Sequence, residues 1–565
     1  MYVDGKLWIA SSQAERIAIL PKMANRHGLI AGATGTGKTV TLKVLAESFS
    51  DMGVPVFLTD VKGDLAGMCR PGEDSQDMQE RIDTFGLAPA GFTYQAYPTC
   101  FWDTSGKKGL PLRTTISEMG PLLLARLLGL TQVQSDILSI VFRIADEDEL
   151  LLIDTKDLRA MLQHVAENSK EYSTRYGNLP KQSVNAILRA VIALETQGGE
   201  QFFGEPALDL HDWMGTDAGG KGMIHILDCG EQIQSPLIYS SFMLWMMSEL
   251  FELLPERGDE EKPRMVFFFD EAHLLFTDMP KVLRDKIEQV VKLIRSKGVG
   301  LYFITQSPSD IPDGVLAQLG NRILHALHAY TPAEQKKLRA AAQSFRPNPA
   351  FCAETALAQL GIGQALVSFL DEEGRPGIVM KGDILPPKSQ MGAITEDVRR
   401  QQIEGSPLYA RYSDYLDRDS AYEFLMRAKK GEEEAAAEAK ARKEEEAREK
   451  EAQREAERQE KEAQREAERQ EKEAQREADR QEKEAARQAA LQERERQKKE
   501  REAERAKKQA MAPVAKVARS AAGTIGREVG NEVGKKVGGS FGKRLGGNVG
   551  AQLARGLMDT LFSRR

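Results

Sequence analysis

The chain has few cysteines and lacks any long apolar run. Its cysteines, Cys69, Cys100, Cys229 and Cys352, are far apart and form no C-x-x-C pair. This spacing argues against a disulfide framework and against a zinc ribbon. No apolar run is long enough to cross a bilayer, and no basic segment followed by an apolar one opens the sequence. We therefore predict a cytoplasmic protein without an integral membrane segment.

The chain also lacks a strong overall excess of positive or negative charge. The net charge is −7 over 565 residues, but it averages unlike segments and so says little about partners. Residues 1–427 are an ordinary globular mixture, whereas Glu, Lys, Arg, Ala and Gln dominate after them. At roughly 100–200 residues per domain, the chain should hold more than one domain.

A complete phosphate-binding motif, G-x-x-x-x-G-K-[ST], occupies residues 32–39. An apolar run precedes it and a helical pattern follows it, which is the strand–loop–helix context that the motif requires. Glycines let backbone N–H groups close around phosphate oxygens, and the helix N-terminus adds partial positive charge. Lys38 is predicted to reach the β- and γ-phosphates, and Thr39 to bind Mg²⁺. The predicted nucleotide-binding residues here are Gly32, Ala33, Thr34, Gly35, Thr36, Gly37, Lys38, Thr39 and Val40.

A second strand supplies the acidic partner that a phosphate loop needs. Residues 265–269 are almost continuously apolar, as in a strand buried on both faces, and they end at Asp270-Glu271. An acid at the carboxyl end of such a strand lies where open α/β sheets bind ligands. We predict that Asp270 holds Mg²⁺ and that Glu271 is the general base for the attacking water. The pair could also cap a helix, a role compatible with catalysis.

Two other strand ends carry polar candidates. Gln306 follows the predicted strand 299–305, where it would sense the γ-phosphate or its attacking water, or would be an ordinary turn residue. Asp60 follows the predicted strand 54–59. It either joins the nucleotide, water and metal network or simply opens the following turn, and the sequence does not decide between these interpretations.

The alternation of strand and helix patterns predicts an α/β fold: a RecA-like parallel sheet of the ASCE P-loop type. Helical spacing of apolar residues over 116–128, 134–145, 155–166 and 181–196 predicts an all-helical insertion. The predicted parts are 1–113, the first part of the ATPase core; 114–200, the helical insertion; 201–427, the second part of the core; 428–511, a charged low-complexity helix; and 512–565, a Gly-periodic tail.

The tail consists of two different patterns. From Lys450 the sequence repeats every 11 residues, close to the pitch of a straight helix, with alanine as the only apolar stripe. We favour a solvated single helix over a coiled coil. Further on, glycines recur every four residues from Gly526 to Gly550. That register fits an oligomerisation or membrane-surface helix, and equally a segment without fixed structure.

Together these landmarks resemble the HerA/FtsK group of P-loop ATPases, and within it the HerA-like YjgR branch. The resemblance covers nearly everything up to about residue 425. It implies an ATPase of the ring-forming motor group that uses ATP and Mg²⁺ as cofactors. It also implies that DNA is a partner and that the chain forms a homo-oligomer, for which a hexameric ring is one form. The strings that carry it are LPKMANRHG at 20–28, DVKGDLAG at 60–67, KDLRAM at 156–161, FFGEPAL at 202–208, DEAH at 270–273 and TQSP at 305–308.

The resemblance also implies two catalytic arginines. By position, Arg295 matches a basic residue that senses nucleotide, and Arg322 matches more loosely an arginine that completes a neighbouring subunit's site. Ordinary ion pairing is the alternative for both. HerA itself has an N-terminal β-barrel that docks a nuclease, and the residues before the phosphate loop are too few for one. We therefore do not carry over a nuclease partner, and the case for ring assembly is weaker.

The leading hypothesis is a cytoplasmic, Mg²⁺-dependent ATPase that works on DNA as an oligomeric motor. DNA is inferred from the resemblance alone, because the core sequence has no strong basic stripe and no aromatic platform for strands. The alternative is an ATP-switched scaffold whose helical arm and glycine-rich tip bind partner proteins or a membrane surface.

Overall fold

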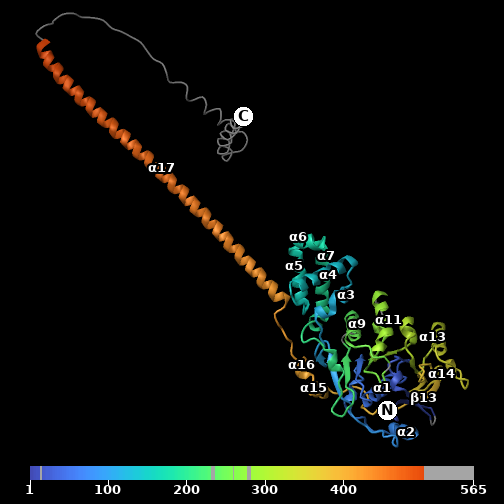
Figure 1. Ribbon diagram of the computed structural model, residues 1–565. Helices are drawn as coiled ribbons and strands as arrows, with labels where there is room; N and C mark the ends of the chain where they lie inside the picture. The colour runs from blue at the N-terminus through green and yellow to red at the C-terminus, as the bar shows by residue number, and fades with distance from the viewer. Residues whose placement is uncertain (13–14, 231–235, 259, 277–280, 502–565) are drawn as a thin grey trace. The chain divides into compact units, whose positions relative to one another are not determined.

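The structure is a computed structural model that describes residues 1–12, 15–230, 236–258, 260–276 and 281–501 (Figure 1). The chain divides into two units, Met1–Ala441 and Arg442–Arg565. Among the described residues, no helix is both long enough and apolar enough to cross a membrane.

One sheet runs through the first unit, in the order β1-β2-β13-β12-β11-β4-β10-β9-β5-β8-β6-β7, with β3 paired to β2. From β11 to β7 the neighbours are parallel, whereas the pairs from β11 to β1 are antiparallel. The predicted α/β fold with a parallel sheet is thus confirmed. The strands are β1 Tyr2–Val3, β2 Lys6–Ser12, β3 Glu15–Ile19, β4 Gly28–Ala31, β5 Val56–Asp60, β6 Thr99–Asp103, β7 Leu110–Pro111, β8 Ile224–Asp228, β9 Met265–Phe269, β10 Val299–Thr305, β11 Asn321–Leu324, β12 Gln364–Ser368 and β13 Met380–Ile384.

Burial on both faces explains why the central strands are so apolar. In β9, Met265, Phe267 and Phe269 belong to the hydrophobic core on one face of the sheet, and Val266 and Phe268 belong to the core on the other. All five are fully buried. Because strand side chains alternate between faces, a strand covered on both sides must be apolar at every position. Polar residues are then left to the strand ends, where ligands bind.

Helices cover both faces of this sheet (Figure 1). The helix after the phosphate loop, α1, packs into one core, whereas α9 and the helices of the insertion pack into the other. The helices are α1 Lys38–Asp51, α2 Gln76–Thr84, α3 Ile116–Leu127, α4 Gln132–Glu147, α5 Thr155–Glu167, α6 Ser169–Tyr176, α7 Lys181–Leu194, α8 Glu200–Phe202, α9 Pro236–Leu253, α10 His273–Phe276, α11 Lys281–Ile294, α12 Asp313–Leu316, α13 Pro332–Gln343, α14 Ala353–Gln359, α15 Glu396–Glu404, α16 Tyr409–Tyr412 and α17 Ala421–Arg501.

The all-helical insertion predicted for residues 114–200 contains α3, α4, α5, α6 and α7, which are grouped together in Figure 1. Side-chain caps define where three of them begin. Thr115, Thr131 and Asp154 each accept a hydrogen bond from a backbone N–H in the first turn, and the residue three positions later bonds back to the cap. Such reciprocal capping boxes satisfy N–H groups that a helix leaves free.

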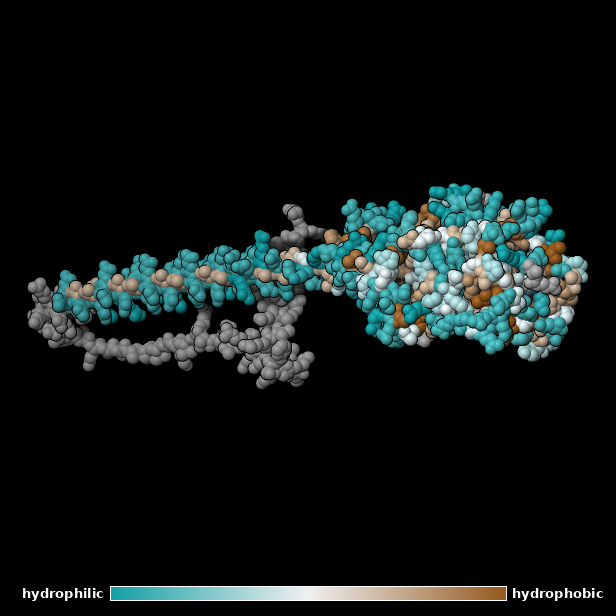
Figure 2. All heavy atoms as spheres, turned by 90° about the horizontal axis from the view of Figure 1, so that it is seen from below, coloured by the Kyte–Doolittle hydropathy of each residue, from teal (hydrophilic) through white to brown (hydrophobic). Residues whose placement is uncertain are grey.

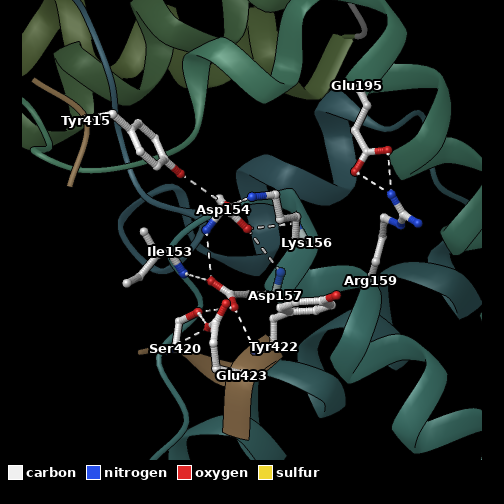
Figure 3. Close-up of polar contacts among 10 residues, drawn as sticks. All are labelled: Ile153, Asp154, Lys156, Asp157, Arg159, Glu195, Tyr415, Ser420, Tyr422 and Glu423. Carbon is white, nitrogen blue, oxygen red and sulfur yellow. Dashed lines mark hydrogen bonds and ion pairs between the residues drawn. The ribbon is translucent and has the colours of Figure 1, made fainter. Parts of the chain in front are cut away.

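One buried carboxylate joins this insertion to the start of α17 (Figure 3). Asp157 Oδ2 accepts hydrogen bonds from the backbone N–H groups of Ile153 and Asp154, at 2.8 and 3.1 Å. Its Oδ1 accepts from Ser420 Oγ at 2.6 Å and from the Tyr422 N–H at 2.9 Å. The helix therefore begins at 421 on the ATPase unit, and the domain boundary predicted at 427/428 falls inside it.

The remainder of α17 is the predicted long charged helix. Side chains from 442 to 489 are exposed throughout. Figure 2 shows a narrow row of apolar residues along an otherwise hydrophilic helix, in keeping with the alanine stripe of the repeat. That this helix is single, and does not pair in a coiled coil, stays a prediction. The Gly-periodic tail, 512–565, lies outside the described residues.

Candidate nucleotide-binding site

The candidate residues lie in a row because their strands are neighbours. β10 pairs in parallel with both β4 and β9, and β9 pairs in parallel with β5. The carboxyl ends of these strands therefore open on the same edge of the sheet. Along that edge, the order is the phosphate loop after β4, Gln306 after β10, Asp270-Glu271 after β9, and Asp60 at the end of β5.

The phosphate loop joins β4 to α1 and depends on its glycines. Gly35 and Gly37 have φ angles of 79° and 110°, a backbone region that side chains rarely tolerate. A Cβ on Gly32 would lie 2.5 Å from His325 Cβ, so this position has no room for a side chain. Lys38 Nζ donates to the carbonyl oxygens of Gly32 and Ala33, at 2.7 and 3.0 Å. The ammonium group of Lys38 therefore contacts the same loop that would bind the phosphates.

His325 supports the loop from the neighbouring strand. It follows β11, is fully buried, and its Nε2 lies 2.8 Å from Thr41 Oγ1 on α1. Its Nδ1 lies 3.0 Å from the carbonyl oxygen of Gln364. Burial lowers the pKa of His325 to about 4, so the ring is neutral at pH 7. No pattern in the sequence indicates this role of His325.

The acidic pair is held in a specific backbone geometry. The Asp270 N–H donates to Thr59 Oγ1 at 2.8 Å, and Asp270 Oδ1 accepts from the Glu271 N–H at 2.9 Å. Glu271 has a φ of 45°, in the left-handed region that non-glycine residues seldom occupy. Burial first, and then the charge of Glu271, raise the pKa of Asp270 to about 7. A buried carboxyl group with a strongly shifted pKa at the end of a strand is a candidate for a functional site.

Glu271 is buried but incompletely paired. Its Oε1 accepts a hydrogen bond from Lys62 Nζ at 2.9 Å. Its Oε2 is buried without a hydrogen bond to any described residue, although His273 Nδ1 lies 3.4 Å away. The bond to Glu271 is the main reason that the pKa of Lys62 is raised. Sequence reasoning missed Lys62, although it lies in the string that was noted for Asp60.

These residues fit a magnesium–triphosphate complex. The loop tip is open, since nothing lies within 4 Å of a Cβ built at Gly35. The N-terminus of α1 and Lys38 supply positive charge, and burial lowers the pKa of Lys38. Thr39 and Asp270 carry oxygen atoms of the kind that Mg²⁺ prefers, and these two residues would hold it. The orphaned Oε2 of Glu271 offers an acceptor to a water molecule.

Gln306 and Asp60 lie on this edge in different environments. Gln306 is exposed and lines a cavity of about 340 Å³ with His273, Phe276 and Asp310, so its role as a sensor stays a prediction. Both carboxylate oxygens of Asp60 are used locally. They accept from the N–H groups of Gly63 at 2.7 Å and Leu65 at 3.0 Å. These bonds favour the interpretation that Asp60 opens the turn, which positions Lys62.

The two arginines are not brought to this edge of their own chain. Arg295 lies in the turn Arg295–Lys297 that precedes β10, and therefore at the opposite end of that strand from Gln306. Arg322 lies near the start of β11, where its guanidinium donates to the carbonyl oxygens of Leu319, Leu316 and Ser344 at 3.0, 3.3 and 3.1 Å. The position of Arg295 in the sequence predicts a nucleotide sensor close to the acidic pair. Helix α11, however, carries the chain back to the edge of the sheet where β10 begins, opposite the nucleotide site. Roles across a subunit boundary stay predictions.

Comparisons with known proteins found one matching family model and several similar solved structures. The model of the family described as helicase HerA-like, C-terminal, matches residues 6–492. Similar solved structures include the bacterial conjugative coupling protein TrwBΔN70, with 15% identity over 68% of this chain and 90% of that chain, at a TM-score of 0.42. TrwB in complex with ADPNP has 14% identity, covering 68% and 91%, at 0.45. VirB4 of Thermoanaerobacter pseudethanolicus has 15% identity, covering 70% and 97%, at 0.43. No curated protein matches the chain in this comparison.

Proposed function

Since the chain belongs to the helicase HerA-like C-terminal family and is a P-loop ATPase of the HerA/FtsK type, we propose that it hydrolyses ATP with Mg²⁺ to move DNA. One observation carries the hydrolytic part of this proposal. The Lys38 loop and the Asp270-Glu271 pair follow strands that are separated by β10 alone. This arrangement supports the proposal, because it leaves a phosphate-binding loop and a candidate general base on either side of one strand end.

Each residue has a role that follows from its surroundings. Bound Mg²⁺–ATP supplies the reactive phosphoanhydride, with the metal neutralising charge on its oxygens. Lys38 exchanges its two loop carbonyls for phosphate oxygens, and the loop N–H groups orient them. Glu271 accepts the proton of the attacking water, for which its buried Oε2 has an unused lone pair. Asp270 and Thr39 hold the metal.

The raised pKa of Asp270 contributes to this chemistry. Burial beside Glu271 makes the ionised form of Asp270 costly. Asp270 would hold a divalent cation in its charged form, and so would give up its proton when the metal binds. Metal binding and deprotonation of Asp270 are therefore coupled in the proposed mechanism.

The motor part of the proposal rests on family membership. It predicts that DNA raises ATP turnover, and that the response falls steeply as salt increases, because phosphate contacts release counterions. Turnover would be measured with and without single- and double-stranded DNA at several salt concentrations. Lys38→Ala, which removes the phosphate-binding ammonium, is the control for contaminating ATPases. Turnover that Lys38→Ala abolishes but that DNA never alters would exclude the motor.

A homo-oligomer is part of the same proposal. Motors of this group act as rings, and sedimentation of the full chain with Mg²⁺ and a non-hydrolysable ATP analogue would detect one. A sedimentation coefficient that corresponds to a single chain under all nucleotide conditions would contradict it. We also propose a cytoplasmic location.

The exposed helix α17 favours a second candidate function. Its side chains from 442 to 489 are exposed, so a partner could bind them. In this second candidate, ATP binding switches a scaffold that holds proteins or a membrane surface. An ATPase that ignores DNA, but binds a protein partner only with ATP, would select this candidate over the motor.

A further inference from the structure

A second cavity lies next to the nucleotide site. It has a volume of about 660 Å³, and its lining includes the turn after β5, the loop between β6 and β7, and helix α15. β5 is the neighbour of β9, and β8 and β6 follow it in the sheet. The cavity therefore continues the same carboxyl edge, on the side of the acidic pair away from the phosphate loop.

Cations from distant parts of the sequence meet in this cavity. They outnumber the carboxylates of the lining, which are Asp228, Glu396 and Glu404. Asp228 is shared, since Lys108 Nζ and the guanidinium of Arg399 lie 3.5 and 3.6 Å from its two oxygens. The lining is therefore net positive, which favours an anionic ligand. The cations are Lys62, Lys107, Lys108, Arg399 and Arg400.

The loop that carries two of these lysines has a fixed shape. Asp103, the last residue of β6, accepts hydrogen bonds from the N–H groups of Lys107 and Lys108 at 2.9 and 3.1 Å. Arg399 Nη1 donates to the Lys108 carbonyl at 3.1 Å and so ties α15 to this loop. A preorganised set of donors binds an anion with less loss of conformational entropy than flexible surface lysines do.

Lys62 connects the cavity to the catalytic carboxylate. It lines the cavity, its side chain is 50% exposed, and its Nζ bonds to the nearly buried Glu271 at 2.9 Å. An ammonium on Oε1 holds Glu271 in place and so fixes the direction of Oε2, the oxygen that would accept the proton of water. The long lysine stem is flexible, and its charge can turn to another anion nearby.

We propose that this cavity binds the phosphodiester backbone of a polynucleotide, and that Lys62 couples its occupancy to hydrolysis. Without the polynucleotide, Lys62 restrains Glu271. A backbone phosphate in the cavity competes for Lys62 and releases the carboxylate to act as general base. The volume is within the range of sites that take ligands of nucleotide size. This inference rests on the proposed DNA-dependent ATPase and names the residues that receive the strand.

The binding half is tested with the full chain and labelled oligonucleotides, single- and double-stranded, by fluorescence anisotropy without ATP. Lys107→Ala/Lys108→Ala should weaken binding tenfold or more. The slope of log K against log salt should become shallower by about 1.4 on single strands. The matched control, Lys336→Ala/Lys337→Ala, removes the same charge from exposed positions on α13 and should change neither quantity. Equal losses in both double variants would overturn the proposed site.

The coupling half is tested on Lys62. Lys62→Met keeps the length of the stem without the charge, so basal turnover should rise several-fold and added DNA should raise it little further. Lys62→Arg keeps a cation beside Glu271 and should retain low basal turnover with DNA stimulation. A Lys62→Met chain with reduced basal turnover, or with full DNA stimulation, would overturn the coupling. Thermal unfolding of both variants checks that they remain folded.

These results separate the inference from the proposed function. Wild-type protein that binds no oligonucleotide and shows no DNA-dependent turnover would overturn both. Stimulation that survives in Lys62→Met and in Lys107→Ala/Lys108→Ala would overturn the inference alone, and would leave the ATP-driven motor intact.

Discussion

Asp157 and Glu271 are both buried carboxylates, but they differ in how completely their oxygens are hydrogen-bonded. Asp157 is 1% exposed, and its two oxygens accept four hydrogen bonds from the insertion and the start of α17. Glu271 is 6% exposed, has an unfavourable φ, and leaves one oxygen without a hydrogen bond. Burial alone raises the pKa of Asp157, and its hydrogen bonds work against that shift.

The difference distinguishes a structural acid from a functional one. Hydrogen bonds that satisfy every lone pair stabilise a buried carboxylate and fix the elements around it. A carboxylate with an unused acceptor and a strained backbone costs stability, and such costs concentrate at functional sites. We therefore expect substitutions at Glu271 to change chemistry and substitutions at Asp157 to change folding.

The largest expected effect is on turnover in Glu271→Gln. The amide keeps the shape and can still bond to Lys62, but it cannot take the proton of water. We expect kcat to fall about 10²- to 10⁴-fold. Affinity for a fluorescent ATP analogue should change little, and the thermal unfolding midpoint should not fall. A drop in kcat of less than tenfold would show that Glu271 is not the base.

The next effect is on stability in Asp157→Ala. The substitution leaves four donors without their acceptor in a buried position, and should lower the free energy of unfolding by about 3 kcal/mol. Ser420→Ala removes only one donor and should cost about 1 kcal/mol. Urea unfolding measures both values. A large loss of kcat in folded Asp157→Ala protein would contradict the separation of the two carboxylates.

A smaller effect concerns pH and Mg²⁺. Because the pKa of Asp270 is about 7 in the folded chain, a proton competes with Mg²⁺ below that pH. We expect the Mg²⁺ concentration for half-maximal turnover to rise up to about tenfold per pH unit below 7 and to level off above it. Turnover at pH 6 to 8.5, corrected for protonation of ATP itself, measures this. An unchanged Mg²⁺ requirement at pH 6 would refute it.

Asp270 should also make the stability of the fold depend on pH, and the direction of this dependence follows from its raised pKa. The folded chain retains a proton on Asp270 between the ordinary pKa of 3.8 and about 7, whereas the unfolded chain loses it. Stability from this group is therefore present below pH 3.8 and is lost as pH rises through 7. Asp270→Asn should remove that dependence and be the more stable protein at pH 8.

The smallest effect is expected at an exposed carboxylate. Glu468 pairs with Lys472 on α17 at 2.9 Å, with both side chains exposed. Such pairs contribute little to stability, so Glu468→Ala should leave the unfolding midpoint of the ATPase unit unchanged. Arg159→Ala is the contrasting variant, because it breaks a bond to the nearly buried Glu195 and should lower that midpoint. Near-ultraviolet circular dichroism would follow both transitions.

The sequence was sufficient to predict those parts of the candidate site that consist of one short continuous segment. The apolar run 265–269 and the motif at 32–39 predict their strands, and parallel strands necessarily open on one edge. Lys62, His325 and the cationic cavity depend instead on which strands are neighbours, which periodicity does not reveal. Arg295 illustrates the same limit, because closeness in sequence to the acidic pair did not place it at that edge.

The sheet has one consequence for how the chain is made. β2 pairs with β13, so that Ala10 and Ser11 lie opposite Ile384 and Asp383. The small meander of β1, β2 and β3 can pair with itself as soon as it leaves the ribosome, yet its place in the sheet does not exist until residues 380–384 have been synthesised. Nearly the whole ATPase unit must therefore be translated before the first strands can join the large sheet.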